Sequence, residues 1–125
     1  MKIRLVLAAL GLMGLGAASH AQDAEQGAKV FKKCMVCHTA DDMTNKVGPS
    51  LKGIVGRKAA SVAGFKYSDA MLAKGAAGVI WDEATLTTYL PDPKRFVPGT
   101  KMTFPGLKTP EDVANVIAYL KTKGM

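Results

Sequence analysis

The sequence predicts a small all-α domain in which about four helices are joined by long irregular loops. Three observations support this fold class. A length of 125 residues leaves room for one domain. Apolar residues recur at helical spacing in two segments, whereas residues 39–66 and 91–109 show neither helical nor strand periodicity. A hydrophobic content of 48% with 22% charged residues excludes a disordered chain, and a total of two cysteines excludes a disulfide-rich scaffold.

Residues 1–21 have the features of a secretory signal peptide. Lys2 and Arg4 form its charged start, an apolar run follows over residues 5–18, and Ser19-His20-Ala21 matches a small-x-small cleavage site. The apolar run is about 14 residues long, shorter than the roughly 20 needed to cross a bilayer, which disfavours the alternative of a membrane anchor.

Cleavage before Gln22 would leave a domain of residues 22–125 with fifteen basic and ten acidic residues, and therefore a net charge of +5 in place of +7. A second apolar run of similar length does not follow in the sequence, so we expect the exported mature protein to be soluble. His38 is then the only histidine of the mature chain, which limits the choice of metal ligands.

The two longest predicted helices lie at the ends of this domain. One spans about residues 23–38, where Asp23 and Gln26 form a capping box before an apolar pattern of helical spacing. The other spans about residues 110–123, with an N-cap at Thr109 and a proline in its first turn. Shorter helices are predicted at about 68–73 and 83–90.

The two unpatterned stretches leave little side-chain material for a core. Loops of such length are uncommon inside a domain of about 100 residues. The aromatic residues, four Phe, three Tyr and one Trp, are also few. We therefore expect a group other than side chains to fill the centre of the domain.

The segment Cys34-Met35-Val36-Cys37-His38 holds both cysteines and the only mature histidine. The pattern C-x-x-C-H is the attachment signature of c-type haem. Two thiols three residues apart lie on roughly one face of a helix, where each can add to a vinyl group of the haem. The histidine that follows can then bind the iron through a neutral imidazole nitrogen.

Three other interpretations of the two cysteines compete with haem attachment. A structural disulfide between Cys34 and Cys37 is compatible with an oxidising compartment. A thioredoxin-like redox pair needs a βαβ context, and the preceding sequence does not read as a strand. A zinc site needs further cysteine or histidine ligands, which the mature chain lacks.

A haem iron bound by one histidine has a sixth coordination position, and the methionines are its candidate ligands. Met35 and Met43 lie too close to His38 in sequence to reach the opposite face of the ring easily, and Met125 is terminal. Met102 follows a turn-rich loop 64 residues after His38. The residues alone favour Met102, with Met71, in a predicted helix, as the alternative.

Residues 23–123 resemble the soluble cytochromes c of the mitochondrial type and their periplasmic bacterial relatives. The resemblance rests on the order and approximate spacing of a set of short motifs. These motifs are the attachment segment 34–38, Val47-Gly48-Pro49-Ser50-Leu51-Lys52-Gly53, Gly56-Arg57-Lys58, Gly64-Phe65-Lys66-Tyr67-Ser68-Asp69-Ala70, Trp81, Tyr89-Leu90 and Pro93-Lys94-Arg95-Phe96-Val97-Pro98-Gly99-Thr100-Lys101-Met102-Thr103-Phe104.

The resemblance implies a small cytochrome c fold wrapped around one haem c, attached through Cys34 and Cys37. It implies that His38 and Met102 are the axial ligands and that the carbonyl of Pro49 accepts the imidazole N–H. Other roles that it implies are hydrogen bonds to the haem propionates and a close crossing of the first and last helices. Arg57, Tyr67 and Trp81 match the propionate positions, and Gly27, Phe31 and Tyr119 match the crossing.

Each propionate assignment has a simpler alternative, because Arg57 could be a solvated charge, Tyr67 a partly exposed aromatic residue and Trp81 a core residue.

Two features also depart from the family. The stretch from Tyr67 to Trp81 is three residues longer than in the mitochondrial proteins, with 75–78 as the expected insertion. Met71 stands where those proteins usually carry an asparagine in a buried polar network. Tyr89 still falls on the Met102 side.

By this resemblance the protein is expected to be a periplasmic, monomeric electron carrier and not an enzyme. Its partners would be a membrane quinol–cytochrome c oxidoreductase and an oxidase, reaction centre or reductase, with nucleic acid excluded by the compartment. A basic patch at the haem edge would steer acidic partners. The patch consists of Lys33, Lys46, Lys94, Arg95, Lys101 and Lys108. The alternative is a haem enzyme or gas sensor with a displaceable sixth ligand.

Overall fold

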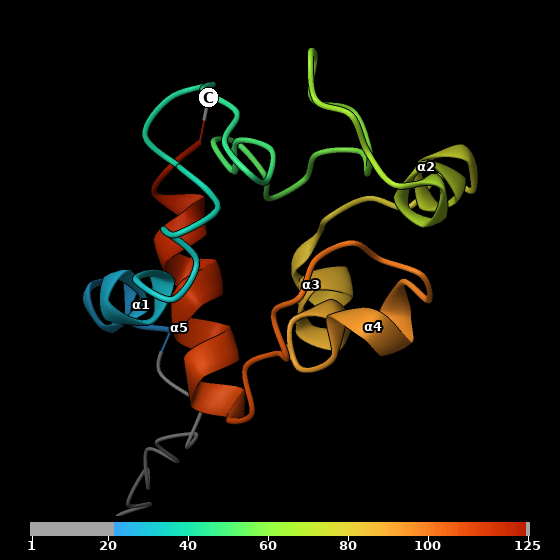
Figure 1. Ribbon diagram of the computed structural model, residues 1–125. Helices are drawn as coiled ribbons and strands as arrows, with labels where there is room; N and C mark the ends of the chain where they lie inside the picture. Colours follow the sequence, from blue (N-terminus) through green and yellow to red (C-terminus); the bar gives the residue numbers. More distant parts are fainter. Residues whose placement is uncertain (1–21, 125) are drawn as a thin grey trace, which may run out of the picture.

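Five α-helices and the loops between them form the part of the chain that the computed structural model describes, residues 22–124 (Figure 1). Within these residues there is no β-strand beyond a single antiparallel bridge between Lys58 and Ile80. The helices are α1 (Ala24–Phe31), α2 (Asp69–Ala76), α3 (Glu83–Tyr89), α4 (Pro93–Phe96) and α5 (Pro110–Lys121). The expected all-α class is confirmed. The expected signal peptide at 1–21 lies outside the described residues.

Helices α1 and α5 cross closely, as Figure 1 shows. Gly27 permits the approach, because a Cβ atom added to it would lie only 1.9 Å from the backbone oxygen of Asn115. Beside this point the rings of Phe31 and Tyr119 pack with their centroids 5.1 Å apart. The close crossing expected from the sequence is therefore confirmed.

The N-cap residues follow the sequence signals, but the capping box predicted for Asp23 and Gln26 is not formed, because Asp23 N–H donates to Asn115 Oδ1 at 3.0 Å instead. The side chain of Asp23 accepts hydrogen bonds from two backbone N–H groups of α1, and Thr109 accepts one from Asp112 at the start of α5. Asp82 caps α3 in the same way. Ser68 caps α2, which extends three residues beyond the predicted end at 73.

The sequence prediction was wrong about the end of α1 and missed α4. The first helix stops at Phe31, because residues 32–37 form turns in which several N–H groups donate to the carbonyl three residues earlier, as Cys34 N–H does to Phe31 O. Helix α4 is a single turn with Pro93 in its first position and Asp92 as its N-cap. Such a short turn has too few residues to show a helical period.

The long loop 39–66 is held by side chains that bind its backbone. The amide of Asn45 donates to Ala63 O at 3.1 Å and accepts from Ser50 N–H at 3.0 Å. Gly53 N–H donates to Lys123 O at 2.7 Å, which fastens the loop to the end of α5. The loop therefore has a defined path without any regular secondary structure.

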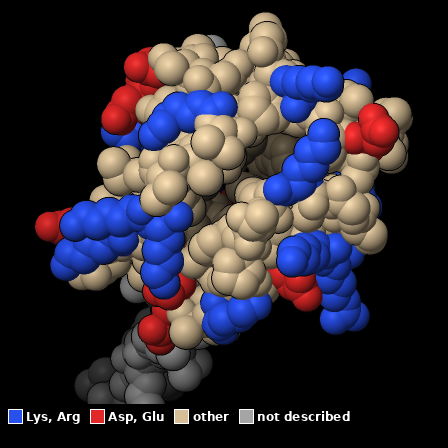
Figure 2. Space-filling view, viewed as in Figure 1, with Lys and Arg blue, Asp and Glu red and all other residues tan. Residues whose placement is uncertain are grey.

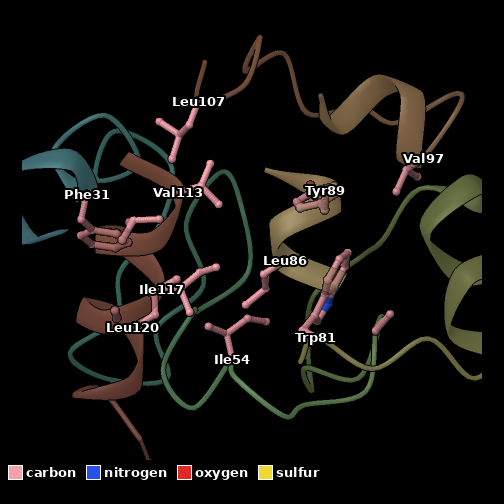
Figure 3. Close-up of a cluster of buried hydrophobic side chains, with 13 residues drawn as sticks. Phe31, Ile54, Trp81, Leu86, Tyr89, Val97, Leu107, Val113, Ile117 and Leu120 are labelled. Atoms are coloured by element: carbon pink, nitrogen blue, oxygen red, sulfur yellow. The ribbon is translucent and has the colours of Figure 1, made fainter. Parts of the chain in front are cut away.

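The buried hydrophobic side chains come from two groups of segments (Figure 3). Phe31, Ile117 and Leu120 belong to the crossing of α1 and α5. Trp81 lies just before the start of α3, and Tyr89 is the last residue of that helix. Ile54, from the long loop, is drawn between the two groups. Among residues 22–124, no helix is long and apolar enough to cross a membrane.

Candidate functional site

The two cysteines and the histidine lie in one tight turn directly after α1. The carbonyl oxygen of Cys34 accepts hydrogen bonds from Cys37 N–H at 3.1 Å and from His38 N–H at 2.9 Å. Both cysteines carry free thiols and are half-buried, and burial raises the pKa of Cys34, an effect that the nearby Lys33 partly offsets. The backbone thus holds both thiols and the imidazole next to one another.

His38 is fixed by the segment that begins at Gly48. Its Nδ1 lies 2.8 Å from the carbonyl oxygen of Pro49, so the expected contact between these residues is confirmed. Because a carbonyl only accepts hydrogen bonds, Nδ1 carries the proton and the lone pair of Nε2 is left for a ligand bond. Burial lowers the pKa of His38, which favours this neutral imidazole; the Pro49 bond opposes the shift and Lys46 adds to it.

Gly48 is a site residue to which the sequence analysis gave no role. A Cβ atom at this position would lie 2.2 Å from Cε1 of His38, inside contact distance. Only glycine therefore lets the loop press against the imidazole ring. The signal was present, since Gly48 precedes Pro49 in one of the family motifs.

Met102 lies in the loop between α4 and α5, and its sulfur is approached by a buried tyrosine. The hydroxyl of Tyr89 donates to Met102 Sδ across 3.5 Å. Burial raises the pKa of Tyr89 to about 12, so the phenol keeps its proton at neutral pH. The expectation that Tyr89 faces Met102 is confirmed.

Met71 occupies a different setting. It lies in the first turn of α2, where its backbone N–H donates to the Ser68 hydroxyl at 3.1 Å. Its side chain is half-buried and packs against the hydrophobic core. Met102 is also half-buried and packed against the core, so what differs between the two methionines is the hydroxyl that approaches the Met102 sulfur.

Arg57 and Trp81 lie next to each other although 24 residues separate them in the sequence. Trp81 N–H donates to Arg57 O at 2.8 Å, and Gly56 N–H donates to Trp81 O at 2.7 Å. The guanidinium of Arg57 binds the backbone oxygens of Ser50, at 2.7 Å, and Lys52, at 3.1 Å. Burial lowers the pKa of Arg57, and the neighbouring Tyr67 offsets part of this shift.

The hydroxyl of Tyr67 accepts a hydrogen bond from Val62 N–H at 2.9 Å, and its ring packs edge-on against Phe65. Trp81 is buried and packs 4.7 Å from the Tyr89 ring, measured between ring centroids. Arg57, Tyr67 and Trp81 therefore form one neighbourhood, which Trp81 connects to the Tyr89–Met102 pair.

The expected basic residues are all exposed, but two of them have hydrogen-bond partners. The ammonium of Lys46 donates to Met35 O at 2.8 Å. That of Lys108 donates to Pro91 O at 3.0 Å and to Pro105 O at 2.8 Å. In Figure 2, Lys and Arg side chains stand around a hollow in the face shown, and acidic side chains are fewer there.

The residues of this site fit a covalently attached haem. One turn supplies two free thiols and an imidazole whose Nε2 is not engaged by Pro49. Between residues 22 and 124, no group of three or more His, Cys, Asp and Glu side chains could hold a metal ion, which removes the support for a zinc site. A separate cleft of about 300 Å³, between the turn at 58–61 and α2, is lined by none of the expected site residues.

Comparisons with known proteins agree with this description. A family model named "Cytochrome c" matches residues 24–123. Cytochrome c2 iso-2 of Magnetospirillum fulvum is 55% identical over 92 residues, which cover 74% of this chain and 93% of that protein. Cytochrome c2 of Rhodomicrobium vannielii is 46% identical over 122 residues, covering 97% and 95%. The solved structure of cytochrome cH from Methylobacterium extorquens matches with a TM-score of 0.74 and 49% identity, covering 81% of this chain and 99% of that one.

Proposed function

Since this chain belongs to the cytochrome c family, which binds one covalent c-type haem, we propose that it is a periplasmic carrier of single electrons with His38 and Met102 as axial ligands. The family and its cytochrome c2 relatives support electron transfer as the general activity. The axial ligands, the compartment and the partners are the further content of the proposal.

The observation that carries the ligand assignment is the hydrogen bond from Tyr89 to the sulfur of Met102. A buried phenol that donates to one lone pair of a thioether holds that sulfur in a fixed orientation and leaves its other lone pair for a metal. Met71 has no such partner among the described residues. The loop position of Met102 and the family motif support the same choice.

The other proposed ligand, His38, would bind the iron as a neutral imidazole with a fixed tautomer. The Pro49 carbonyl keeps the proton on Nδ1 and orients the ring, and Gly48 closes the space beside it. When bound, the haem supplies an iron that changes by one electron between its ferric and ferrous states. The residues around it hold both ligands in place, which limits the rearrangement that accompanies a change of charge.

Ligation by histidine and methionine leaves no coordination position for a substrate, which favours outer-sphere electron transfer over the alternative of a haem enzyme or gas sensor. Those functions need a sixth position that is open or readily vacated. Tyr89 opposes this, because its hydrogen bond keeps Met102 from moving away. Arg57, Tyr67 and Trp81 form the neighbourhood that we assign to the haem propionates.

The ligand assignment is tested by replacing each candidate methionine in turn. Met102→Ala is expected to abolish the weak near-infrared sulfur–iron band of the oxidised protein. Met71→Ala, which removes another half-buried methionine, is the matched control and should keep the band. A band that survives in Met102→Ala would contradict the proposal, as would its loss in Met71→Ala alone.

The basic residues support docking to an acidic partner, and we propose a membrane quinol–cytochrome c oxidoreductase as donor and an oxidase, reaction centre or reductase as acceptor. The carrier would act as a monomer.

Localisation is tested by fractionating cells and sequencing the N-terminus of the isolated protein. A mature chain that starts at Gln22 in the periplasmic fraction supports the proposal, and an intact residue 1 in the cytoplasm contradicts it.

A further inference from the structure

The loop that carries Met102 is closed at its base against the end of α3. In Figure 1 the chain between α4 and α5 runs back beside α3. There Leu107 N–H donates to the carbonyl oxygen of Leu90, the C-cap residue of α3, at 2.8 Å. If the whole loop moves and carries Met102 with it, this hydrogen bond must stretch or break.

Gly106 makes the contact unusually close. A Cβ atom at this position would lie 2.1 Å from Pro91 O, and the residue has a φ of +109°, which side-chain-bearing residues rarely adopt. The backbones of the loop and of the corner after α3 therefore touch directly.

Lys108 bridges the two sides of this contact. Its ammonium donates to Pro91 O, at the corner after α3, and to Pro105 O, within the loop itself. Both acceptors are backbone carbonyls, and a cation near the C-terminal end of a helix is also favoured by the helix dipole. Lys108 therefore fastens the loop to α3 with a charged group on its exposed side.

The end of α3 thus holds the loop at two points. Tyr89, in the last turn of α3, binds the sulfur of Met102 in the middle of the loop. Two residues later, Pro91 is bound by Lys108 at the base of the loop. Both contacts hold the same loop. Loss of the Lys108–Pro91 hydrogen bond would therefore let the loop move and weaken the Tyr89–Met102 hydrogen bond.

We propose that Lys108 is a positioning residue that keeps the Met102 loop closed and so disfavours the replacement of Met102 by other ligands. The inference rests on the proposed function, because it takes Met102 as the sixth ligand. It gives Lys108 a role that the other residues of the basic patch do not share. The charge of Lys108 still adds to the patch, but its hydrogen bonds act on the loop.

The test compares three variants of the haem-loaded protein in their reaction with imidazole, a neutral ligand whose approach does not depend on the charge that is removed. Lys108→Gln is expected to lower the apparent Kd for imidazole about tenfold, because the open loop becomes more populated. Lys108→Arg should recover most of the wild-type value. Lys94→Gln removes the same charge at another exposed position of the patch and should stay within about twofold of wild type.

Hydrogen exchange at the Leu107 amide gives a second readout that does not depend on the iron. Its N–H is bound to Leu90 O, and it should exchange about tenfold faster in Lys108→Gln and unchanged in Lys94→Gln. If the wild type lacks the sulfur–iron band, Met102 ligation fails and the exchange rate alone decides on the role of Lys108. Unchanged exchange and unchanged imidazole binding in Lys108→Gln, or equal effects in Lys94→Gln, would overturn the inference.

Discussion

The hydroxyl of Tyr89 donates to the sulfur of Met102 across 3.5 Å, while the Tyr89 ring packs against Trp81 with a centroid separation of 4.7 Å. One side chain thus joins the proposed sixth ligand to the buried aromatic group. Its position is set by α3, whose N-terminus is capped by Asp82 directly after Trp81. The local order Trp81-Asp82 therefore helps to determine where the phenol meets the thioether.

Removing this phenol should lower the reduction potential. A hydrogen bond to the thioether withdraws electron density from the sulfur and so disfavours the ferric state. Tyr89→Phe is expected to lower the potential by about 20–40 mV, which corresponds to a hydrogen bond about 0.5–1 kcal/mol stronger in the ferrous than in the ferric state. A spectroscopic redox titration measures the change, with Tyr119→Phe as a control that should leave the potential within about 10 mV of wild type. A higher potential in Tyr89→Phe would contradict the interpretation.

The same tyrosine should make the protein less stable at high pH. Burial raises the pKa of Tyr89 to about 12 from 10.0, so the folded protein holds the phenolic proton more tightly than the unfolded chain does. This stabilisation is complete below pH 10 and is lost as the pH rises through 12, up to about 2–3 kcal/mol. Guanidinium unfolding at pH 9 and pH 11.5 should show a larger loss for wild type than for Tyr89→Phe, and equal losses would refute this role of the phenol.

The helix crossing should not tolerate a methyl group at Gly27. Gly27→Ala directs its Cβ at the backbone oxygen of Asn115, which lies 1.9 Å away and cannot rotate aside. We expect a loss of roughly 2–4 kcal/mol in the free energy of unfolding, despite the better helix propensity of alanine. Gly124→Ala is the control, because its Cβ would meet only Lys121 O at 3.7 Å. Denaturant unfolding that places both variants at wild-type stability would show that the crossing can relax.

Arg57 should contribute to stability through the carbonyls that it binds. Arg57→Met leaves the backbone oxygens of Ser50 and Lys52 without this donor, at an expected cost of about 1 kcal/mol after allowance for partial solvent exposure. Arg57→Lys, which can bind one of the two carbonyls, should lie between the variant and wild type. Thermal unfolding measures the difference, with the exposed Arg95→Met as a control. Equal melting temperatures for the Arg57 and Arg95 variants would show that the hydrogen bonds of Arg57 to the two carbonyls do not contribute to stability.

The basic patch should accelerate reaction with anions. We expect the oxidation of the reduced protein by ferricyanide to slow as ionic strength rises, because the positive field attracts the reagent. Neutralising Lys94 and Arg95 to Gln should reduce the rate severalfold at low salt. The matched pair Lys29→Gln and Lys32→Gln removes two charges outside the patch and should have a smaller effect. Equal effects of the two pairs would show that only net charge matters.

The sequence predicted the helices whose caps are explicit and failed where the chain changes direction. Thr109 and Pro110 gave the start of α5, and Asp82 gave the start of α3, because a cap is a local signal. The end of α1 was not predictable in this way. The segment from 32 to 37 continues the helical hydrophobic pattern, but several of its backbone hydrogen bonds already span three residues instead of four.

The attachment segment and the candidate ligand Met102 were visible in the sequence, but their supporting contacts were only partly so. The Pro49–His38 and Tyr89–Met102 contacts were expected from the family resemblance. The two hydrogen bonds of Lys108 had no signal, because a lysine among other lysines does not reveal that its ammonium meets two carbonyls. The same holds for Asn45, whose amide joins segments of a loop that has no period.

The crossing of α1 and α5 also orders events during biogenesis. About 80 residues separate Phe31 from Pro110, so a chain synthesised from its N-terminus presents α1 long before its packing partner. During that interval α1, which leads into the turn with Cys34 and Cys37, lacks the packing of the last helix. The support that the last helix gives to α1, and through it to the turn that follows, is therefore completed only when the final residues of the chain are available.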